Sequence, residues 1–306
     1  MSRPEPGAGT HYAQAFRATG HGPQTRGNAR PLVSRPVQPY GPLTHLRVDR
    51  EPDGRAGVVV VTLDLPQRRN AMSEEMTRSW QRVMAALREE AELRAVVVTG
   101  AGSAFCAGGD LDWIAGEPGA SVAALRARML IFYRAWLSVG ELEVPTIAAV
   151  NGAAVGAGLA VALACDLRYV ASEASLSAPF TALGLHPGMG TTWLLPEVAG
   201  LPVAREMLLA GRVVYGHEAV ALGLANRAFS QDRLLAEALD VASAVAARAP
   251  IATRLTKSAL VAGGHASAEA ALRWEGLAQP ATMASDDLAE GIAAARERRT
   301  PRFRGR

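Results

Sequence analysis

The stretch best suited to chemistry in this sequence runs from Pro145 to Ala171, PTIAAVNGAAVGAGLAVALACDLRYVA. An apolar, partly β-branched run at 146–150 is short enough for a buried strand, and Asn151-Gly152 then breaks it. Gly156-Ala157-Gly158 leads into an apolar helix over 159–164. The first N–H groups of such a helix have no partner within it, so they can stabilise negative charge on a ligand. The sequence therefore predicts an anion-stabilising turn at this helix start.

A second glycine pair precedes an acid in the segment Ala104-Phe105-Cys106-Ala107-Gly108-Gly109-Asp110-Leu111. Two glycines let a backbone approach a ligand closely, because no Cβ stands in the way. Glycine pairs also make ordinary turns, so this pattern alone is weak evidence for a site.

These two turns need a scaffold, and the hydrophobic pattern predicts one in which strands alternate with helices. Strands are expected at 43–48, 57–63, 95–99, 146–150 and 166–170. Alternation of this kind favours parallel pairing with right-handed crossovers. Helices are expected at 73–90, with Ser73 as N-cap, and at 121–139, 201–210, 216–222, 234–248, 251–261, 267–276 and 285–298.

Composition indicates a globular chain, with 306 residues of which 20% are charged and 49% hydrophobic. The net charge of +3 gives little reason to expect nucleic acid as a partner. The run from Thr146 to Cys165 holds twenty uncharged residues, the length of a membrane span, but glycines and Asn151 interrupt it and alanine dominates it. We interpret it as buried core, not membrane. The apolar surroundings of Cys106 and Cys165 fit a reducing, cytoplasmic location.

Residues 1–42 differ from the rest, with seven prolines, six glycines, five arginines and one acid. This Pro/Gly/Arg-rich tail has no hydrophobic periodicity and is expected to be disordered. An Arg-rich, acid-poor segment is also typical of an organellar transit peptide. A flexible tail or a wrongly assigned start codon would explain it as well.

Together these segments resemble the crotonase, or enoyl-CoA hydratase/isomerase, superfamily from about residue 43 to the C-terminus. The order and spacing of several short pieces carry the resemblance. They are LPQRRNAM at 65–72, FCAGGDL at 105–111, AAVNGAAVGAG at 148–158, CD at 165–166, LGLHPGMG at 183–190 and ERRTPRF at 297–303.

The resemblance implies an α/β core that spirals through repeated ββα units over residues 43–230, followed by a helical trimerisation region at 231–306. In this superfamily two backbone N–H groups grip the thioester oxygen of an acyl-CoA, and by position they are those of Gly109 and Ala157. The family binds acyl-CoA as its substrate, with no cofactor and no metal, and assembles as a homotrimer or hexamer. By analogy the CoA path would be lined by Arg68, Ala107, Gly109, Asp110 and Leu111, with Arg298 or Arg299 at a CoA phosphate. A solvated basic tail explains the last two arginines equally well.

The chain departs from its family where hydratases carry a pair of catalytic glutamates. By position these are Ala160 and Phe180, and neither side chain can transfer a proton. His186 lies near a position where some relatives carry a catalytic Asp, and a histidine can act as acid or base near neutral pH. A structural histidine in a Gly/Pro loop is the simpler interpretation. Weaker candidates, each expected on a solvated surface, are Asp112, Tyr133 and His217.

Three functions stay open on the sequence alone. The chain could be an enzyme that performs other thioester chemistry, such as decarboxylation, isomerisation or hydrolysis, with His186 as its candidate acid or base. It could be a hydratase that recruits an acid from elsewhere. It could also be a non-catalytic acyl-CoA binder or partner subunit.

Overall fold

The computed structural model describes residues 40–50, 55–115, 119–261 and 267–306. Positions 1–39 of the predicted disordered tail therefore lie outside the described residues. Tyr40 is only 4% exposed and belongs to the core, and Arg82 donates a hydrogen bond to the carbonyl of Pro42. Residues 40–42 thus belong to the folded part and not to the tail.

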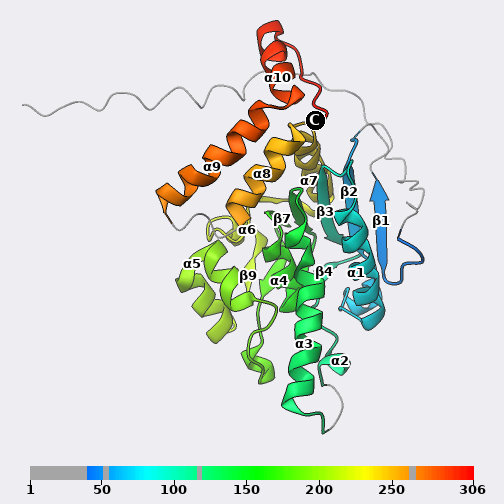
Figure 1. Cartoon of the computed structure of the whole chain (residues 1–306). Helices are drawn as coiled ribbons and strands as arrows, with labels where there is room; N and C mark the ends of the chain where they lie inside the picture. The colour runs from blue at the N-terminus through cyan, green and yellow to red at the C-terminus, as the bar shows by residue number, and fades with distance from the viewer. Residues whose placement is uncertain (1–39, 51–54, 116–118, 262–266) are drawn as a thin grey trace, which may run out of the picture. The chain divides into compact units, whose positions relative to one another are not determined.

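The larger sheet contains six strands in the order β1-β2-β3-β5-β7-β10 (Figure 1). Strand β1 pairs antiparallel with β2, and the other neighbours are parallel. Central strands such as β2 and β5 are buried along their whole length, which explains their unbroken runs of Val, Ile and Ala. The strands are β1 (Leu46–Arg50), β2 (Val58–Leu63), β3 (Ala95–Gly100), β5 (Thr146–Val150), β7 (Leu167–Ala171) and β10 (Arg227–Phe229). The first strand therefore begins and ends later than the predicted 43–48.

A second, four-stranded sheet has the order β4-β6-β8-β9. Its strands are β4 (Ala104–Cys106), β6 (Ala153–Val155), β8 (Ser175–Ser177) and β9 (Val214–Tyr215). Each of β3, β5 and β7 is followed by one short strand of this sheet and then by a helix. This is the repeated ββα unit that the resemblance implied. Both glycine turns follow a strand of the second sheet, so the sheet brings them together.

The helices cover the sheets and form the C-terminal region (Figure 1). They are α1 (Glu74–Arg88), α2 (Leu111–Ala115), α3 (Val122–Leu137), α4 (Ala157–Ala164), α5 (Thr191–Leu209), α6 (Gly216–Ala219), α7 (Gln231–Ala246), α8 (Pro250–Val261), α9 (Ala268–Met283) and α10 (Asp286–Glu297), with short 3-10 turns η1 (Pro66–Arg68), η2 (Ser138–Glu141) and η3 (Thr181–Leu183). The predicted helix at 201–210 matches the second part of α5, which a kink at Gly200 separates from a first part that begins at Thr191. The predicted N-cap is confirmed, because the Ser73 hydroxyl accepts a hydrogen bond from the backbone N–H of Met76.

Two tryptophans fix α3 against α1. The rings of Trp80 and Trp136 stack with their centroids 4.7 Å apart, and both are fully buried. The indole N–H of Trp80 donates to the carbonyl of Ala135, and that of Trp136 donates to the hydroxyl of Thr77. Each buried indole therefore has its hydrogen-bond partner, which makes this helix pair a rigid support.

The helix α8 is anchored to the core by a buried ion pair. Lys257, which is 7% exposed, lies 2.8 Å from the Asp166 carboxylate and also donates to the carbonyl of Val144. The same Asp166 oxygen accepts hydrogen bonds from the backbone N–H and the hydroxyl of Thr146. This network ties α8 to the residue pair that follows α4, and all its charged groups are satisfied.

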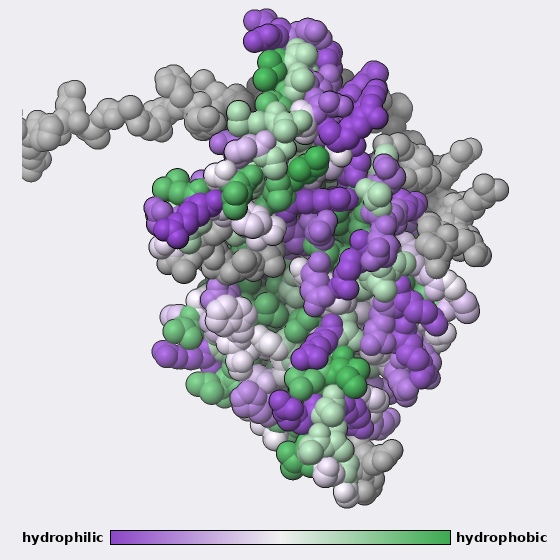
Figure 2. All heavy atoms as spheres, in the orientation of Figure 1, coloured by the Kyte–Doolittle hydropathy of each residue, from purple (hydrophilic) through white to green (hydrophobic). Residues whose placement is uncertain are grey.

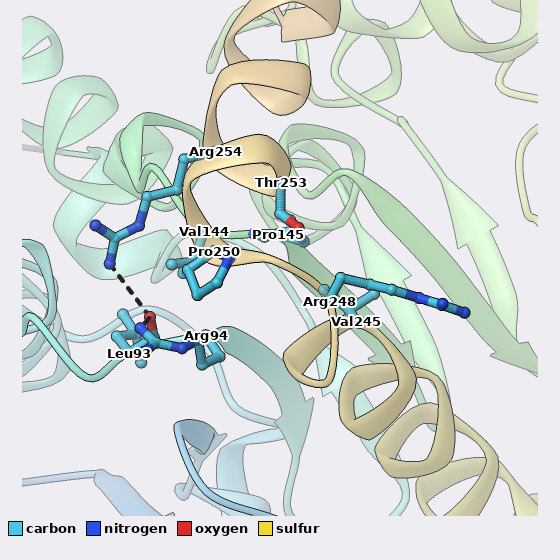
Figure 3. Close-up of a pocket in the computed structure, with 9 residues that line it drawn as sticks. All are labelled: Leu93, Arg94, Val144, Pro145, Val245, Arg248, Pro250, Thr253 and Arg254. Atoms are coloured by element: carbon cyan, nitrogen blue, oxygen red, sulfur yellow. Dashed lines mark hydrogen bonds between the residues drawn. The ribbon is translucent and has the colours of Figure 1, made fainter. Parts of the chain in front are cut away.

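Figure 3 shows a small cavity beneath the start of α8, where Arg254 donates a hydrogen bond to the carbonyl of Leu93. Its volume is about 10 Å³ and its lining includes Val144, Pro145 and Pro250. That volume holds about one water molecule, so this cavity is not a ligand site. No helix among the described residues is long and apolar enough to cross a membrane.

Candidate active site

Asn70 organises the loop that leads to the first glycine turn. Its side chain is fully buried, accepts a hydrogen bond from the backbone N–H of Leu65, and donates to the carbonyls of Ala101, Ala104 and Phe105. Its backbone is left-handed, with φ of 56°, a conformation that asparagine tolerates better than most residues. One amide thus fixes the segment 65–72 against the strand that precedes Gly108.

The Gly108-Gly109 turn is held by backbone contacts on one side and by close packing on the other. Ala107 donates to the carbonyl of Arg69, and Met72 donates to the carbonyl of Gly108 at 2.8 Å. Gly108 has φ of 98°, and a Cβ there would lie 2.7 Å from the carbonyl oxygen of Val155. Only glycine fits this position.

The second turn, Gly156-Ala157-Gly158, starts α4 against the same strand. Gly156 has φ of 54° and donates its N–H to Ser177, while the N–H of Ala160 closes the first helical turn onto the Gly156 carbonyl. A Cβ at Gly158 would lie 2.3 Å from the carbonyl oxygen of Cys106. The start of α4 therefore packs directly on the end of β4 because Gly158 has no side chain.

This packing brings the two glycine turns, which carry the two predicted donors, against each other. A Cβ built on Gly108 would lie 3.6 Å from the backbone nitrogen of Ala157. Within the described residues, the N–H groups of Gly109 and Ala157 have no hydrogen-bond partner outside the regular helix and strand ladders. Gly109 is half-buried and Ala157 is buried. Two adjacent N–H groups without an acceptor can bind an oxyanion.

The two positions where related hydratases carry glutamate are apolar here in structure as well as in sequence. Ala160 is fully buried on the first turn of α4. The ring of Phe180 lies over the start of the same helix, 3.6 Å from where a Cβ of Gly156 would be. Apolar side chains therefore stand at both positions, with no carboxylate at either.

His186 lies in the loop after Phe180 and is exposed. Its Nδ1 donates a hydrogen bond of 2.8 Å to the carbonyl of Pro187, within its own loop. A neutral ring with Nδ1 protonated keeps Nε2 as an acceptor, so the side chain can still accept a proton. No contact of this side chain joins it to Gly109 or Ala157.

Two of the expected CoA-lining residues, Arg68 and Asp110, form an ion pair beside the first glycine turn. Arg68 lies 2.9 Å from Asp110, which is buried, and 3.9 Å from Asp112, which is exposed. Asp110 also accepts from the backbone N–H of Asp112 and so caps α2. Leu111 is 62% exposed and Ala107 is half-buried. Arg68 is thus held by carboxylates, which the sequence analysis did not foresee.

The C-terminal arginines take no part in this ion pair. Arg298 ends α10 in a left-handed conformation, with φ of 54°. Arg299 is bound by Glu290 and Glu297. The hydrogen bonds that Glu290 accepts from the Arg299 side chain and from the backbone N–H of Arg302 lower its pKa to about 2. Figure 1 shows α10 at the end of the described structure away from α2 and α3.

The cysteine nearest to the site is inert. Cys106 is fully buried, donates its S–H to the carbonyl of Asn70, and accepts a weak hydrogen bond from the N–H of Gly108. Burial raises the pKa of its thiol to about 12, so the thiolate is not populated at neutral pH. Among the described residues, no group of three or more His, Cys, Asp and Glu side chains could hold a metal ion.

Tyr133 was expected on a solvated surface, and that prediction is wrong. The residue is half-buried on α3, and burial raises the pKa of its hydroxyl. Helix α3 has apolar residues on every side, so its periodicity did not indicate which face is covered. The other two weak candidates, Asp112 and His217, are exposed as expected.

Comparisons with known proteins show which family the chain resembles in sequence and fold. The sequence model of the enoyl-CoA hydratase/isomerase family matches residues 53–306. Human enoyl-CoA hydratase domain-containing protein 2, mitochondrial, is 36% identical over 259 residues, which cover 82% of this chain and 86% of that protein. Human methylglutaconyl-CoA hydratase, mitochondrial, is 32% identical over 269 residues, covering 85% and 77%. The crystal structure of an enoyl-CoA hydratase from Bacillus anthracis has a TM-score of 0.80 and 33% identity, covering 86% of this chain and all of that one.

Proposed function

The chain belongs to the enoyl-CoA hydratase/isomerase family, and on that premise we propose that it binds acyl-CoA and stabilises the thioester oxyanion through the N–H groups of Gly109 and Ala157. The observation that supports this proposal is the packing of Gly108 against the start of α4, where a Cβ built on Gly108 would lie 3.6 Å from the Ala157 nitrogen. Neighbouring donors of this kind are worth about 3 kcal/mol each to an oxyanion in a site shielded from water.

The chemistry of the site differs from hydration by paired glutamates. Ala160 and Phe180 provide neither the base that activates water nor the acid that protonates the α-carbon. Thioester reactions that need an enolate or oxyanion but no paired carboxylates remain compatible, which include decarboxylation, isomerisation and hydrolysis. A non-catalytic acyl-CoA binder is the alternative, and His186 is a candidate acid or base if turnover occurs.

A matched pair of ligands tests the thioester contact. Butyryl-CoA carries the carbonyl oxygen that the two N–H groups would bind, and S-butyl-CoA, a thioether, lacks it. We expect the thioester to bind about tenfold or more tightly, because two hydrogen bonds contribute about 0.5–1.5 kcal/mol each. Isothermal titration calorimetry measures both affinities. Equal affinities, or no binding of either ligand at millimolar concentration, would contradict the proposal.

We also propose assembly into a homotrimer or hexamer. Helix α9 has no buried residue in the described structure and exposes Leu272, Leu277 and Met283. Figure 2 shows apolar side chains at the surface over α8, α9 and α10, between charged ones. Apolar patches of this kind are typical of subunit contacts. Light scattering on the purified chain should give three or six times the mass of 32.1 kDa, and a monomer at micromolar concentration would exclude the proposal.

We also propose a cytoplasmic location, because the two cysteines are buried and free, as is typical of a reducing compartment.

A further inference from the structure

Helix α2 begins directly after the first glycine turn and carries one side chain back onto that turn. The backbone N–H of Ile114 donates to the carbonyl of Asp110 at 2.8 Å, which closes a single helical turn. A Cβ built on Gly109 would lie 2.8 Å from the Cδ1 of Ile114 and 3.4 Å from its Cγ1. The Ile114 side chain therefore occupies the space that the missing side chain of Gly109 leaves open.

This contact, and not the backbone conformation, explains glycine at position 109. Gly109 has no positive φ, whereas its neighbour Gly108 has φ of 98°. Apart from the chain neighbours of Gly109, Ile114 is the described residue within 4 Å of such a Cβ, and no backbone atom comes as close. The open side of Gly109 is therefore filled by Ile114.

A second contact ties the same glycine to the core. Gly109 forms a parallel bridge with Met72, which is 1% exposed, and Met72 donates its N–H to the carbonyl of Gly108 at 2.8 Å. A glycine has no side chain of its own to restrict its φ and ψ. The direction of the Gly109 N–H therefore depends on these outside contacts, with Met72 on the core side and Ile114 on α2.

Helix α2 is too small to hold Ile114 in place by itself. It has five residues, and none of them is buried. Helices shorter than about 12–15 residues are marginal in isolation. The Asp110 carboxylate caps its start by accepting from the backbone N–H of Asp112 at 3.0 Å, but this contact fixes only the first turn. The position of α2 therefore needs support from another element.

Arg128 of α3 provides that support. Its guanidinium donates a hydrogen bond of 2.7 Å to the carbonyl of Trp113 and lies 4.5 Å from the centre of the Trp113 ring. That carbonyl belongs to the same peptide group as the N–H of Ile114. The Trp113 ring also packs on Phe132, with centroids 4.7 Å apart. Helix α3 thus holds the peptide group next to Ile114 from two directions.

The Arg128 side chain is placed there at a cost. Its Nε is buried and has no hydrogen-bond partner within the described residues. A buried donor left unpaired costs about 1–3 kcal/mol. The contacts with Trp113 must offset that cost, so Arg128 is committed to α2 and is not a mobile surface cation.

We propose, on the basis of the acyl-CoA function above, that Ile114 is a positioning residue for the oxyanion donor Gly109 and that Arg128 holds it in place. Ile114 does not take part in the reaction: it keeps the Gly109 N–H directed at the thioester oxygen. Donors that are fixed beforehand stabilise an oxyanion best, because they do not reorganise during the reaction. The second donor, Ala157, needs no such support, because it begins α4, which is buried almost throughout.

The test compares Ile114→Ala with Ile131→Ala, which makes the same chemical change at a residue of α3 that is 65% exposed. Isothermal titration calorimetry with butyryl-CoA and S-butyl-CoA measures how strongly each variant prefers the thioester. Ile114→Ala should reduce this preference by about 2–12-fold, the equivalent of one hydrogen bond of about 0.5–1.5 kcal/mol. Its affinity for the thioether should stay within about twofold of wild type, and Ile131→Ala should behave as wild type with both ligands.

Arg128→Met tests the support from α3. It keeps an apolar stem but removes the hydrogen bond to Trp113, so it should lower the thioester preference as Ile114→Ala does. The double variant Ile114→Ala/Arg128→Met should show no larger loss than either single variant, because both changes act on the same N–H. Additive losses would show that the two residues act independently and would contradict the proposed role of Arg128.

A size exchange makes the contact with Gly109 specific. Ile114→Val removes Cδ1, and Gly109→Ala adds a Cβ where Cδ1 lay while keeping the N–H. Each single variant should lower the thioester preference, and the double variant Gly109→Ala/Ile114→Val should regain it, because the space is filled again. A role of Ile114 in stability alone would give no such recovery.

The outcomes separate this inference from the function on which it rests. Circular dichroism melting checks the fold of each variant, and if Ile114→Ala does not fold, the size exchange and Arg128→Met decide in its place. A folded Ile114→Ala variant with the wild-type preference would overturn the inference, as would a size exchange without recovery. Wild-type protein that binds both ligands equally, or neither, would instead refute the proposed oxyanion function.

Discussion

Hydration of crotonyl-CoA by this protein is expected to be at least about 10²–10⁴-fold slower than by an enzyme with paired catalytic carboxylates. The reason is chemical: at Ala160 and Phe180 no side chain can activate water or protonate the α-carbon. The loss of enoyl-thioester absorbance in the ultraviolet measures the rate directly. Typical enzyme turnover, on the order of 1–10³ per second, would show that another acid reaches the thioester.

A gain-of-function pair provides the control. The double variant Ala160→Glu/Phe180→Glu restores both carboxylates, and the smaller Glu side chain frees part of the volume of the Phe180 ring. We expect measurable hydration from the double variant and little from either single variant, because the two groups act on different atoms of the same reaction. If the double variant binds butyryl-CoA with unchanged affinity yet stays inactive, the two positions do not correspond to the hydratase carboxylates.

Replacing Ala157 by proline should lower any thioester turnover by about 10²–10³-fold, or about 3 kcal/mol of barrier, because proline has no N–H to donate. Proline is well tolerated at the first position of a helix, and Ala157 is that position in α4. Ala157→Gly is the matched control, because it keeps the N–H and removes only the methyl group. Circular dichroism melting checks that the fold survives.

The affinities for butyryl-CoA and S-butyl-CoA make the outcome specific. The proline variant should lose the preference for the thioester and keep the affinity for the thioether, which engages CoA only. A folded Ala157→Pro variant with wild-type turnover and the wild-type preference would exclude the N–H of Ala157 as an oxyanion donor.

Much of the fold could be predicted because its signals are local. The β-branched runs at 58–63, 95–100 and 146–150 can only be buried strands, and each lies in the parallel part of the larger sheet. The glycines at 108 and 158 also indicate close backbone contacts, and in the structure a Cβ at either position would clash with a neighbouring carbonyl oxygen. The glycine pattern therefore predicts where the two turns lie, but not that they contact each other.

The rest depends on contacts between distant segments, which no local pattern contains. Arg68 was expected to line the CoA path, and its ion pair with Asp110, 2.9 Å away, is made only by the fold. Tyr133 looked like a surface residue, because a helix that is apolar on every side does not reveal which face packs. In the fold its hydroxyl lies beside Gly188, a residue fifty-five positions further along the chain.

The anchor of α8 has a consequence for covalent chemistry. Lys257 is the only lysine of the chain, and its ammonium is buried between Asp166 and the carbonyl of Val144. Acyl thioesters transfer their acyl group to free amines, by attack of the amine on the carbonyl and departure of the thiol. A buried ammonium with both partners in place is not a nucleophile. No side chain of this chain therefore presents an exposed lysine amine to an acyl thioester.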